Sequence, residues 1–258
     1  MSVMVAAQVG AVARRSVLRT LRQPAMAIPP LVFPLALLAV NAGGLEPSTA
    51  LPGFPTDSFL AFALAVPFIQ GALFSTMNAG TDLARDIQTG FLNRLSLTSM
   101  RGSALLAGQL AGIVALGLIQ AVVYIGVGLI VGVRLASGPG GIFVLLAFAA
   151  LVSLGFGALG SFMALRTGSG EAIQGLFPIL FVFLFFSSMN TPRNLIAVDW
   201  FRAVATANPV SYLIECVRSL IITGWDAEAL ALGFGIGAVI TAVSIVLASW
   251  SLRGRLGR

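Results

Sequence analysis

The sequence contains no histidine, no lysine and a single cysteine, and each scarcity excludes a class of chemistry. Without lysine, the chain cannot form the nucleotide-binding loop G-x-x-x-x-G-K-[ST], in which the lysine contacts the phosphates. Without histidine, it has neither a histidine general base nor a histidine metal ligand. Cys216 cannot form a disulfide within the chain, and we interpret it as a small apolar packing residue.

Charge is also scarce, because 9% of the 258 residues are charged and 58% are hydrophobic. Soluble domains carry roughly 25% charged residues, so we expect lipid to surround most of this chain. All 15 basic residues are arginines, and they give a net charge of +6. They lie between long apolar runs rather than in one patch, which favours membrane topology over nucleic-acid binding.

Six apolar stretches are long enough to cross a membrane, for which about 20 residues are needed. They predict an all-α integral membrane protein with six transmembrane helices, in a single domain that covers residues 1–258. The stretches are 25–43, 58–80, 104–133, 142–165, 172–189 and 229–252.

The placement of the arginines predicts the orientation of these spans. If both termini are cytoplasmic, 11 of the 15 arginines fall on the cytoplasmic side and four fall outside. Cytoplasmic loops of membrane proteins carry an excess of basic residues. We therefore predict a multi-pass protein of a bacterial plasma membrane with both termini in the cytoplasm. The outer arginines are Arg134, Arg193, Arg202 and Arg218.

The six predicted spans contain no Asp, Glu, Arg, Lys or His. A transporter driven by a proton or sodium gradient normally keeps an ionisable residue inside the bilayer, where it binds or releases the coupling ion. Their absence disfavours a gradient as the energy source. Binding of sodium by the carbonyls of unwound helices is the alternative that stays open.

Residues 1–23 form the first of three segments outside the spans. Arg15, Arg19 and Arg22 fall on one side of a helix there, and apolar residues fall largely elsewhere. This pattern predicts a helix on the cytoplasmic membrane surface, whose arginines contact lipid phosphates. A solvated basic tail is the alternative.

The loop 81–103 is the longest predicted cytoplasmic connection. Ala84, Ile87, Phe91 and Leu95 recur in it at helical spacing. An amphipathic helix here must bury its apolar stripe against lipid, against its own spans or against another protein. A glycine in a helix costs about 1 kcal/mol relative to alanine, so we expect a bend at Gly90.

Two carboxylates in this loop allow a different interpretation. Asp82 and Asp86 are four residues apart and fall on one helix face, as a metal site for a lipid-modifying enzyme would require. Two carboxylates are too few to hold Mg²⁺ without bound substrate phosphate, and both have Arg85 and Arg94 as nearby partners. We expect neither a catalytic residue nor a metal site on this chain.

The outer segment 190–228 contains a well-marked helix. Asn208 is a favourable N-cap, and Pro209 follows at the first helical position, where its missing N–H has no cost. An apolar stripe follows, Gly224 ends the helix, and Glu215 and Arg218 have the spacing of an ion pair. About 15 residues extend only about 22 Å. We therefore expect a re-entrant helix hairpin that dips into the outer leaflet or lies along it.

In these two loops the chain resembles permeases of the ABC-2 type transporter family. The cytoplasmic segment 85–98 is RDIQTGFLNRLSLT, similar to the family's acidic residue, Thr-Gly-Thr-Leu and Leu-Leu-x-Thr-Pro pattern. Phe91 and Ser99 depart from it, standing where Thr and Pro are common. The outer segment 208–218, NPVSYLIECVR, resembles the family's Asn-Pro helix.

The resemblance implies a permease that exports a hydrophobic or amphiphilic substrate, and it is strongest to drug-export permeases of the daunorubicin-resistance type. The implied partners are two ATP-binding cassette ATPase subunits, which carry the ATP and Mg²⁺, and a second permease copy or paralogue in the lipid membrane. This chain would carry no cofactor. The implied ATPase-coupling residues are Asp86, Thr89, Gly90, Arg94 and Leu95, and those of an outer gate helix are Asn208, Pro209, Glu215 and Arg218.

Polar residues inside the spans are candidates for a substrate path between two permeases, since polar groups avoid lipid. The alternative is that each forms a hydrogen bond to a neighbouring helix of its own bundle. Two other functions stay open: a lipid-modifying enzyme that uses Asp82 and Asp86, and an ATP-independent channel. The path candidates are Gln70, Asn78, Gln120, Tyr124 and Gln174.

Overall fold

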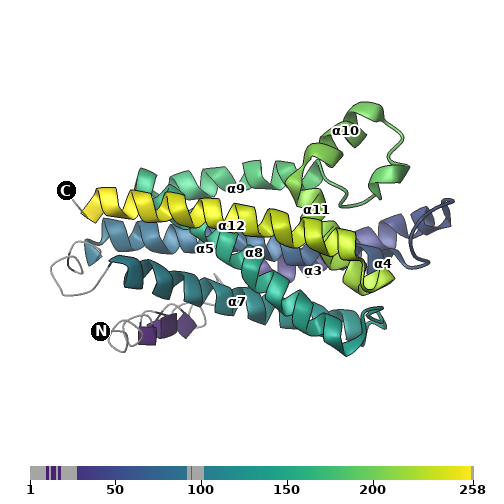
Figure 1. Cartoon of the computed structure of the whole chain (residues 1–258), viewed down its shortest axis with the longest axis horizontal. Coiled ribbons are helices and arrows are strands. Elements are labelled where there is room, and N and C mark those ends of the chain that lie inside the picture. The colour runs from purple at the N-terminus through teal and green to yellow at the C-terminus, as the bar shows by residue number, and fades with distance from the viewer. Residues whose placement is uncertain are drawn as a thin grey trace.

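The computed structural model describes residues 10–11, 13–15, 17–18, 28–91, 94 and 102–256. Every regular element in this part of the chain is helical (Figure 1). The α-helices are α3 (Pro29–Leu45), α4 (Phe59–Ala63), α5 (Ala65–Gln88), α7 (Gly102–Ile130), α8 (Gly138–Thr167), α9 (Gly170–Phe185), α10 (Asp199–Ala207), α11 (Pro209–Arg218) and α12 (Ala227–Leu256). Three shorter turns are the 3₁₀ turns η1 (Glu46–Ala50) and η2 (Arg193–Leu195) and the π-helical turn η3 (Ser219–Thr223).

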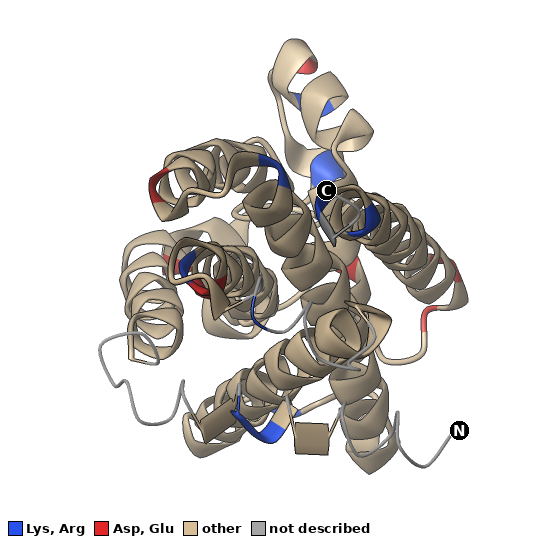
Figure 2. Ribbon diagram, turned by 90° about the vertical axis from the view of Figure 1, so that its left-hand side faces the viewer, with Lys and Arg blue, Asp and Glu red and all other residues tan. Residues whose placement is uncertain are grey.

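The long helices run side by side along the length of the molecule (Figure 1). The C-terminal end of α12 and the described N-terminal residues lie at one end, which we call the termini end. The small helix α10 projects at the other end, which we call the α10 end. Figure 2 views the bundle from the termini end, with charged residues on only small parts of the ribbons.

Among the residues that the structure describes, five stretches are long and apolar enough to cross a membrane: Pro29–Ala50, Phe59–Gln88, Gly102–Ile130, Gly138–Thr167 and Ala227–Arg255. They coincide with five of the six predicted spans. The remaining prediction, 172–189, corresponds to α9, which is a shorter apolar helix of 16 residues. All described residues between 10 and 18 are helical, as predicted for the N-terminal segment.

Helix α5 lies at the centre of the bundle, because it packs against α3, α7, α8, α9 and α11. Nearly all of its residues are buried, whereas only a small share of the residues of α3 and α12 is buried. The predicted span ends at Gly80, and α5 continues beyond it to Gln88, through residues that were predicted to have helical spacing. The extra two turns bury Leu83 and Ala84 in an apolar cluster with α7, α8, α9 and α12.

Glycines on α8 allow three helices to approach it closely. A Cβ atom added to Gly160 would lie 2.0 Å from the carbonyl oxygen of Thr76 on α5. Added to Gly157, it would lie 2.8 Å from Ile113 on α7, and added to Gly155, 2.5 Å from Thr241 on α12. Lipid tails are as apolar as the helices, so association in a membrane depends on close packing of this kind.

A proline in α3 determines the role of one polar side chain on α7. Pro34 has no N–H, so the carbonyl of Pro30, four residues earlier, lacks its helical donor. The hydroxyl of Tyr124 donates a hydrogen bond to that carbonyl at 2.5 Å. Because a lone backbone carbonyl is costly in an apolar interior, this bond ties α3 to α7.

The close contact at Gly160 predicts a sensitive position. We expect Gly160→Ala to destabilise the protein by about 1–3 kcal/mol, because its methyl group must displace the backbone of α5. Gly235 on α12 is the matched control, since no atom lies within 4 Å of a Cβ added there. Gly235→Ala should be neutral or stabilising by up to about 1 kcal/mol.

Thermal unfolding of both variants in the same detergent measures the difference. Equal midpoints for Gly160→Ala and Gly235→Ala would contradict the assigned packing.

Candidate functional site: two polar ends of the bundle

Helix α11 begins as the sequence predicts. The Asn208 side chain accepts a hydrogen bond from the N–H of Val210 at 2.9 Å, and Pro209 occupies the first helical position. The helix continues through η3 and ends at Gly224, whose φ of 97° favours glycine.

The apolar stripe of α11 is buried in the bundle. The helix packs against α5, α9 and α12, and its residues Leu213, Ile214, Cys216 and Val217 have no exposed surface. The stripe therefore packs against protein in this chain rather than against lipid. This placement brings the polar side chains of α11 inside the protein as well.

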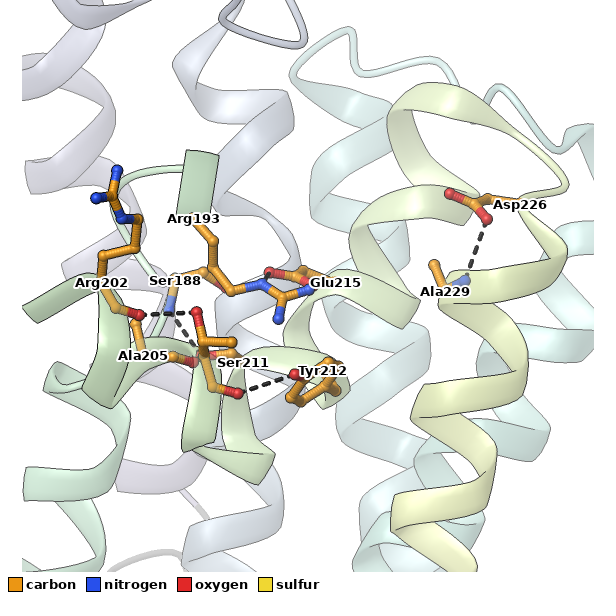
Figure 3. A network of polar contacts seen from close by, with 10 residues as sticks. Ser188, Arg193, Arg202, Ala205, Ser211, Tyr212, Glu215, Asp226 and Ala229 are labelled. Carbon is orange, nitrogen blue, oxygen red and sulfur yellow. Dashed lines mark hydrogen bonds and ion pairs between the residues drawn. The ribbon is translucent and has the colours of Figure 1, made fainter. Parts of the chain in front are cut away.

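Four polar residues, on α11 and at its N-cap, are spaced three or four positions apart. They bind the end of α9 and the segment that follows it. The side-chain nitrogen of Asn208 donates to the carbonyls of Phe183, at 2.5 Å, and Phe186, at 2.8 Å. Ser211 accepts the N–H of Ser188 and donates to the carbonyl of Ala205 (Figure 3). The four residues are Asn208, Ser211, Glu215 and Arg218.

The predicted pair of Glu215 with Arg218 is replaced by a longer-range one. Glu215 accepts two hydrogen bonds from Arg193, at 2.8 and 2.6 Å, in a bidentate ion pair (Figure 3). Burial disfavours the charge of Arg193, but the carboxylate of Glu215 outweighs this, so the pKa of Arg193 is raised. Sequence spacing missed this pair because Arg193 lies on η2, 22 positions away.

Arg218 binds backbone instead. Its Nε donates to the carbonyl of Phe62 on α4 at 3.1 Å, and one terminal nitrogen donates to the carbonyl of Met189 at 3.0 Å. The guanidinium lies 3.5 Å from the ring centroid of Phe62, in cation–π geometry. Burial lowers the pKa of Arg218 to about 9, so the group stays protonated at neutral pH. Arg218 thus joins α4, α11 and the segment after α9.

A cavity of about 580 Å³ opens beside this network at the α10 end. Residues from α4, η2, α10, α11, η3 and α12 line it. Its charged lining residues are Arg193, Arg202, Glu215, Arg218 and Asp226.

The termini end holds the segment for which ATPase coupling is predicted. Helix α5 ends at Gln88 with Thr89 as its C-cap, and Gly90 adopts a φ of +68°, which confirms the predicted bend. Thr89 and Arg94 are exposed. Leu95 lies outside the described residues.

Asp86 does not face outward with these residues. It is 5% exposed, and its carboxylate pairs with Arg15 of the N-terminal segment at 3.1 Å. Arg15 also lies 4.0 Å from the centroid of the Phe91 ring. The N-terminal segment is therefore attached to the segment for which coupling is predicted, and Asp86 is buried behind that segment.

The neighbouring turn between α8 and α9 also contacts this region. The amide of Gln88 donates to the carbonyl of Gly168, and Arg255 donates to the carbonyl of Leu165. The end of α5, the α8–α9 turn and the last turn of α12 are thereby connected. Within the described ranges, no group of three or more His, Cys, Asp or Glu residues is placed to hold a metal ion.

The polar residues proposed for a substrate path are dispersed. Tyr124 is bonded to α3, as the alternative of contacts within the bundle predicts, and Gln120 packs on Gly71 of α5. Asn78 is buried, and Gln174 is exposed on α9. The amide of the fully buried Gln70 has no hydrogen-bond partner among the described residues. A role in substrate passage stays a prediction for all five.

Comparison with known proteins identifies the family. The model of a family described as ABC-2 type transporter matches residues 7–222, which include the coupling segment and α11. The chain belongs to the ABC-2 type transporter family.

This ABC-2 chain is also similar to a daunorubicin resistance ABC transporter permease protein of Streptomyces coeruleorubidus, with 29% identity over 196 residues. The alignment covers 74% of the chain and 65% of that relative, so the chain spans just under two thirds of its length. With five helices of spanning length in its described part, the chain is a multi-pass membrane protein.

The double role of Asn208 generates a prediction. Asn208→Ala removes the cap of α11, worth about 1 kcal/mol, and leaves the carbonyls of Phe183 and Phe186 without donors, at about 1–3 kcal/mol. Asn208→Asp retains an oxygen for the N–H of Val210 but has no N–H to donate. We therefore expect both variants to unfold at a lower temperature than the parent chain.

Asn194 provides the control, since it is exposed on η2. Asn194→Ala should leave the unfolding temperature unchanged in the same detergent. If Asn208→Asp unfolded at the same temperature as the parent chain, the hydrogen bonds from Asn208 to Phe183 and Phe186 would not contribute to stability.

Proposed function

We propose that this chain is the permease subunit of an ATP-driven exporter that moves a hydrophobic or amphiphilic substrate out of the cell. The observation that carries the proposal is the family match over residues 7–222. The relative's name refers to daunorubicin resistance, and we propose a drug-like or lipid substrate for this chain. Since the chain has no lysine for an ATP-binding loop, ATP and Mg²⁺ would bind to a partner.

The assembly we propose contains two ATPase subunits and a second permease, either another copy of this chain or a paralogue. The interior of the single bundle favours a path between two permeases. Its core consists of large apolar side chains, and glycine contacts bring α8 close to its neighbours. Little space is left there for a substrate to pass.

We place the termini end in the cytoplasm and the α10 end outside, as the arginine distribution favours. In this topology the chain crosses the membrane six times, and α9 is the fifth crossing. Its 16 residues extend about 24 Å, less than the roughly 30 Å of a bilayer core. The segment 186–192, which follows α9 and is bound by α11, would complete the crossing. The N-terminal helix would lie on the cytoplasmic surface.

The continuity of α5 supports the proposed coupling. The helix runs for 24 residues from the predicted docking turn at Gly90 back to Ala65, next to α4. Phe62 of α4 is the residue that Arg218 contacts at the other end. An ATPase that displaced the turn would therefore move a rigid helix connected to the α10 end. We propose that this movement alternates access between the two sides.

Gly90→Pro tests the coupling role. Proline fixes φ near −65° and lacks an N–H, whereas Gly90 has a φ of +68° and donates to the carbonyl of Ile87. We expect the variant to insert into the membrane but to lose transport and co-purification with the ATPase. Gly90→Asn is the control, because asparagine tolerates the left-handed conformation, and it should retain both.

Mild detergent extraction from the native host measures docking, and ATP-dependent uptake of a fluorescent hydrophobic drug into inside-out vesicles measures transport. Unchanged docking and transport in Gly90→Pro would refute the coupling assignment. Drug flux without ATP would favour a channel, and metal-dependent activity of the isolated chain would favour a lipid-modifying enzyme.

A further inference from the structure

The charged groups that line the cavity at the α10 end can be assigned partners one by one. Glu215 binds Arg193 through both of its oxygens. Asp226 accepts hydrogen bonds from the N–H of Glu228 and from the N–H of Ala229, the second of which is drawn in Figure 3, and so caps α12. Both carboxylates of the lining are thus engaged.

The arginines of the lining differ from one another. Arg193 has Glu215 as its counter-ion, and Arg202 has Asp199. Arg218 has no carboxylate within ion-pair distance in the part of the chain that the structure describes. Glu215 lies one turn earlier and its charge acts on Arg218, but that carboxylate is already shared with Arg193. Arg193, Glu215 and Arg218 together carry one net positive charge.

The positive charge on Arg218 lies in an apolar environment. The residue is 5% exposed, between the ring of Phe62 and two backbone carbonyls, and it borders the cavity. Carbonyls and an aromatic face supply only partial negative charge. A buried ion is costly unless it is paired, so an anion that enters the cavity would satisfy it.

Helix α10 indicates the depth of the cavity in the membrane. Arg202 and Thr206 line the cavity, whereas Trp200 and Val204 occupy the opposite face and are exposed. Trp200, at 62% exposure, contacts Phe201 and Phe186 in an aromatic cluster. Tryptophan and amphipathic helices of this kind lie at the level of the lipid headgroups, where the abundant anion is phosphate.

We propose that this cavity binds the phosphate group of a membrane phospholipid, with Arg218 as the counter-charge, while the opposite, apolar face of α10 contacts the surrounding lipid. The site lies in whichever leaflet the α10 end occupies, and it does not depend on coupling to an ATPase. A failure of the exporter proposal would therefore leave it standing.

Native mass spectrometry of the full chain in detergent tests the site with three probes: didecanoyl phosphatidylglycerol, didecanoylglycerol and inorganic phosphate. We expect the parent chain to bind the phospholipid and not the phosphate-free diacylglycerol. Arg218→Gln should weaken phospholipid binding about tenfold, because a charge-assisted contact is lost. Arg134→Gln is the control, since Arg134 is exposed at the same end and does not line this cavity.

Asp226→Asn keeps the test decisive if Arg218→Gln does not fold. Asparagine retains the oxygen that caps α12 but removes a negative charge from the lining, so phospholipid should bind about two- to fivefold more tightly.

Several results would overturn the proposal: equal phospholipid binding by the parent chain and folded Arg218→Gln, an equal loss in Arg134→Gln, or no gain in Asp226→Asn. Equal binding of the diacylglycerol and the phospholipid would show that the phosphate does not contribute to binding. If the chain bound inorganic phosphate but not the phospholipid, the ligand of the cavity would be a free anion rather than a lipid.

Discussion

A backbone carbonyl without a hydrogen-bond donor is costly in an apolar, water-free environment, and this constraint explains how α9 ends. Helix α9 ends at Phe185 after 16 residues, and the chain then continues without regular structure to η2. The carbonyls of Phe183, Phe186 and Met189 receive donors from Asn208 and Arg218 on α11. Helix α11 must therefore lie inside the bundle, and its burial places Arg218 beside the cavity.

The same constraint acts wherever a helix departs from regular geometry. Pro34 deprives a carbonyl of its donor, and Tyr124 of α7 replaces it. In the π-helical turn η3, the carbonyls of Leu220 and Ile221 accept N–H groups from the connection between α7 and α8, and Ser137 adds its hydroxyl to Leu220. Each departure thus creates a specific contact between helices, in an environment where apolar side chains alone give little preference for protein over lipid.

The two polar ends are connected through one helix. Helix α5 carries the turn at Gly90 at the termini end, and at the other end it adjoins α4, whose Phe62 contacts Arg218. At the termini end, Asp86 holds the N-terminal segment through Arg15. A displacement at one end therefore has a continuous, tightly packed route to the other.

The sequence by itself determined the helical class, the positions of five spans, the cap at Asn208 and the bend at Gly90, because apolar run length, capping and glycine conformation are local properties. It also determined the family, through two short loop patterns. Tertiary structure decided that Glu215 pairs with Arg193 rather than Arg218, that Asp86 is buried against Arg15, and that Tyr124 serves a carbonyl of α3. These contacts join residues 22, 71 and 94 positions apart. Spacing along one helix cannot predict them, because they depend on which helices pack together and on where a backbone group is left without a partner.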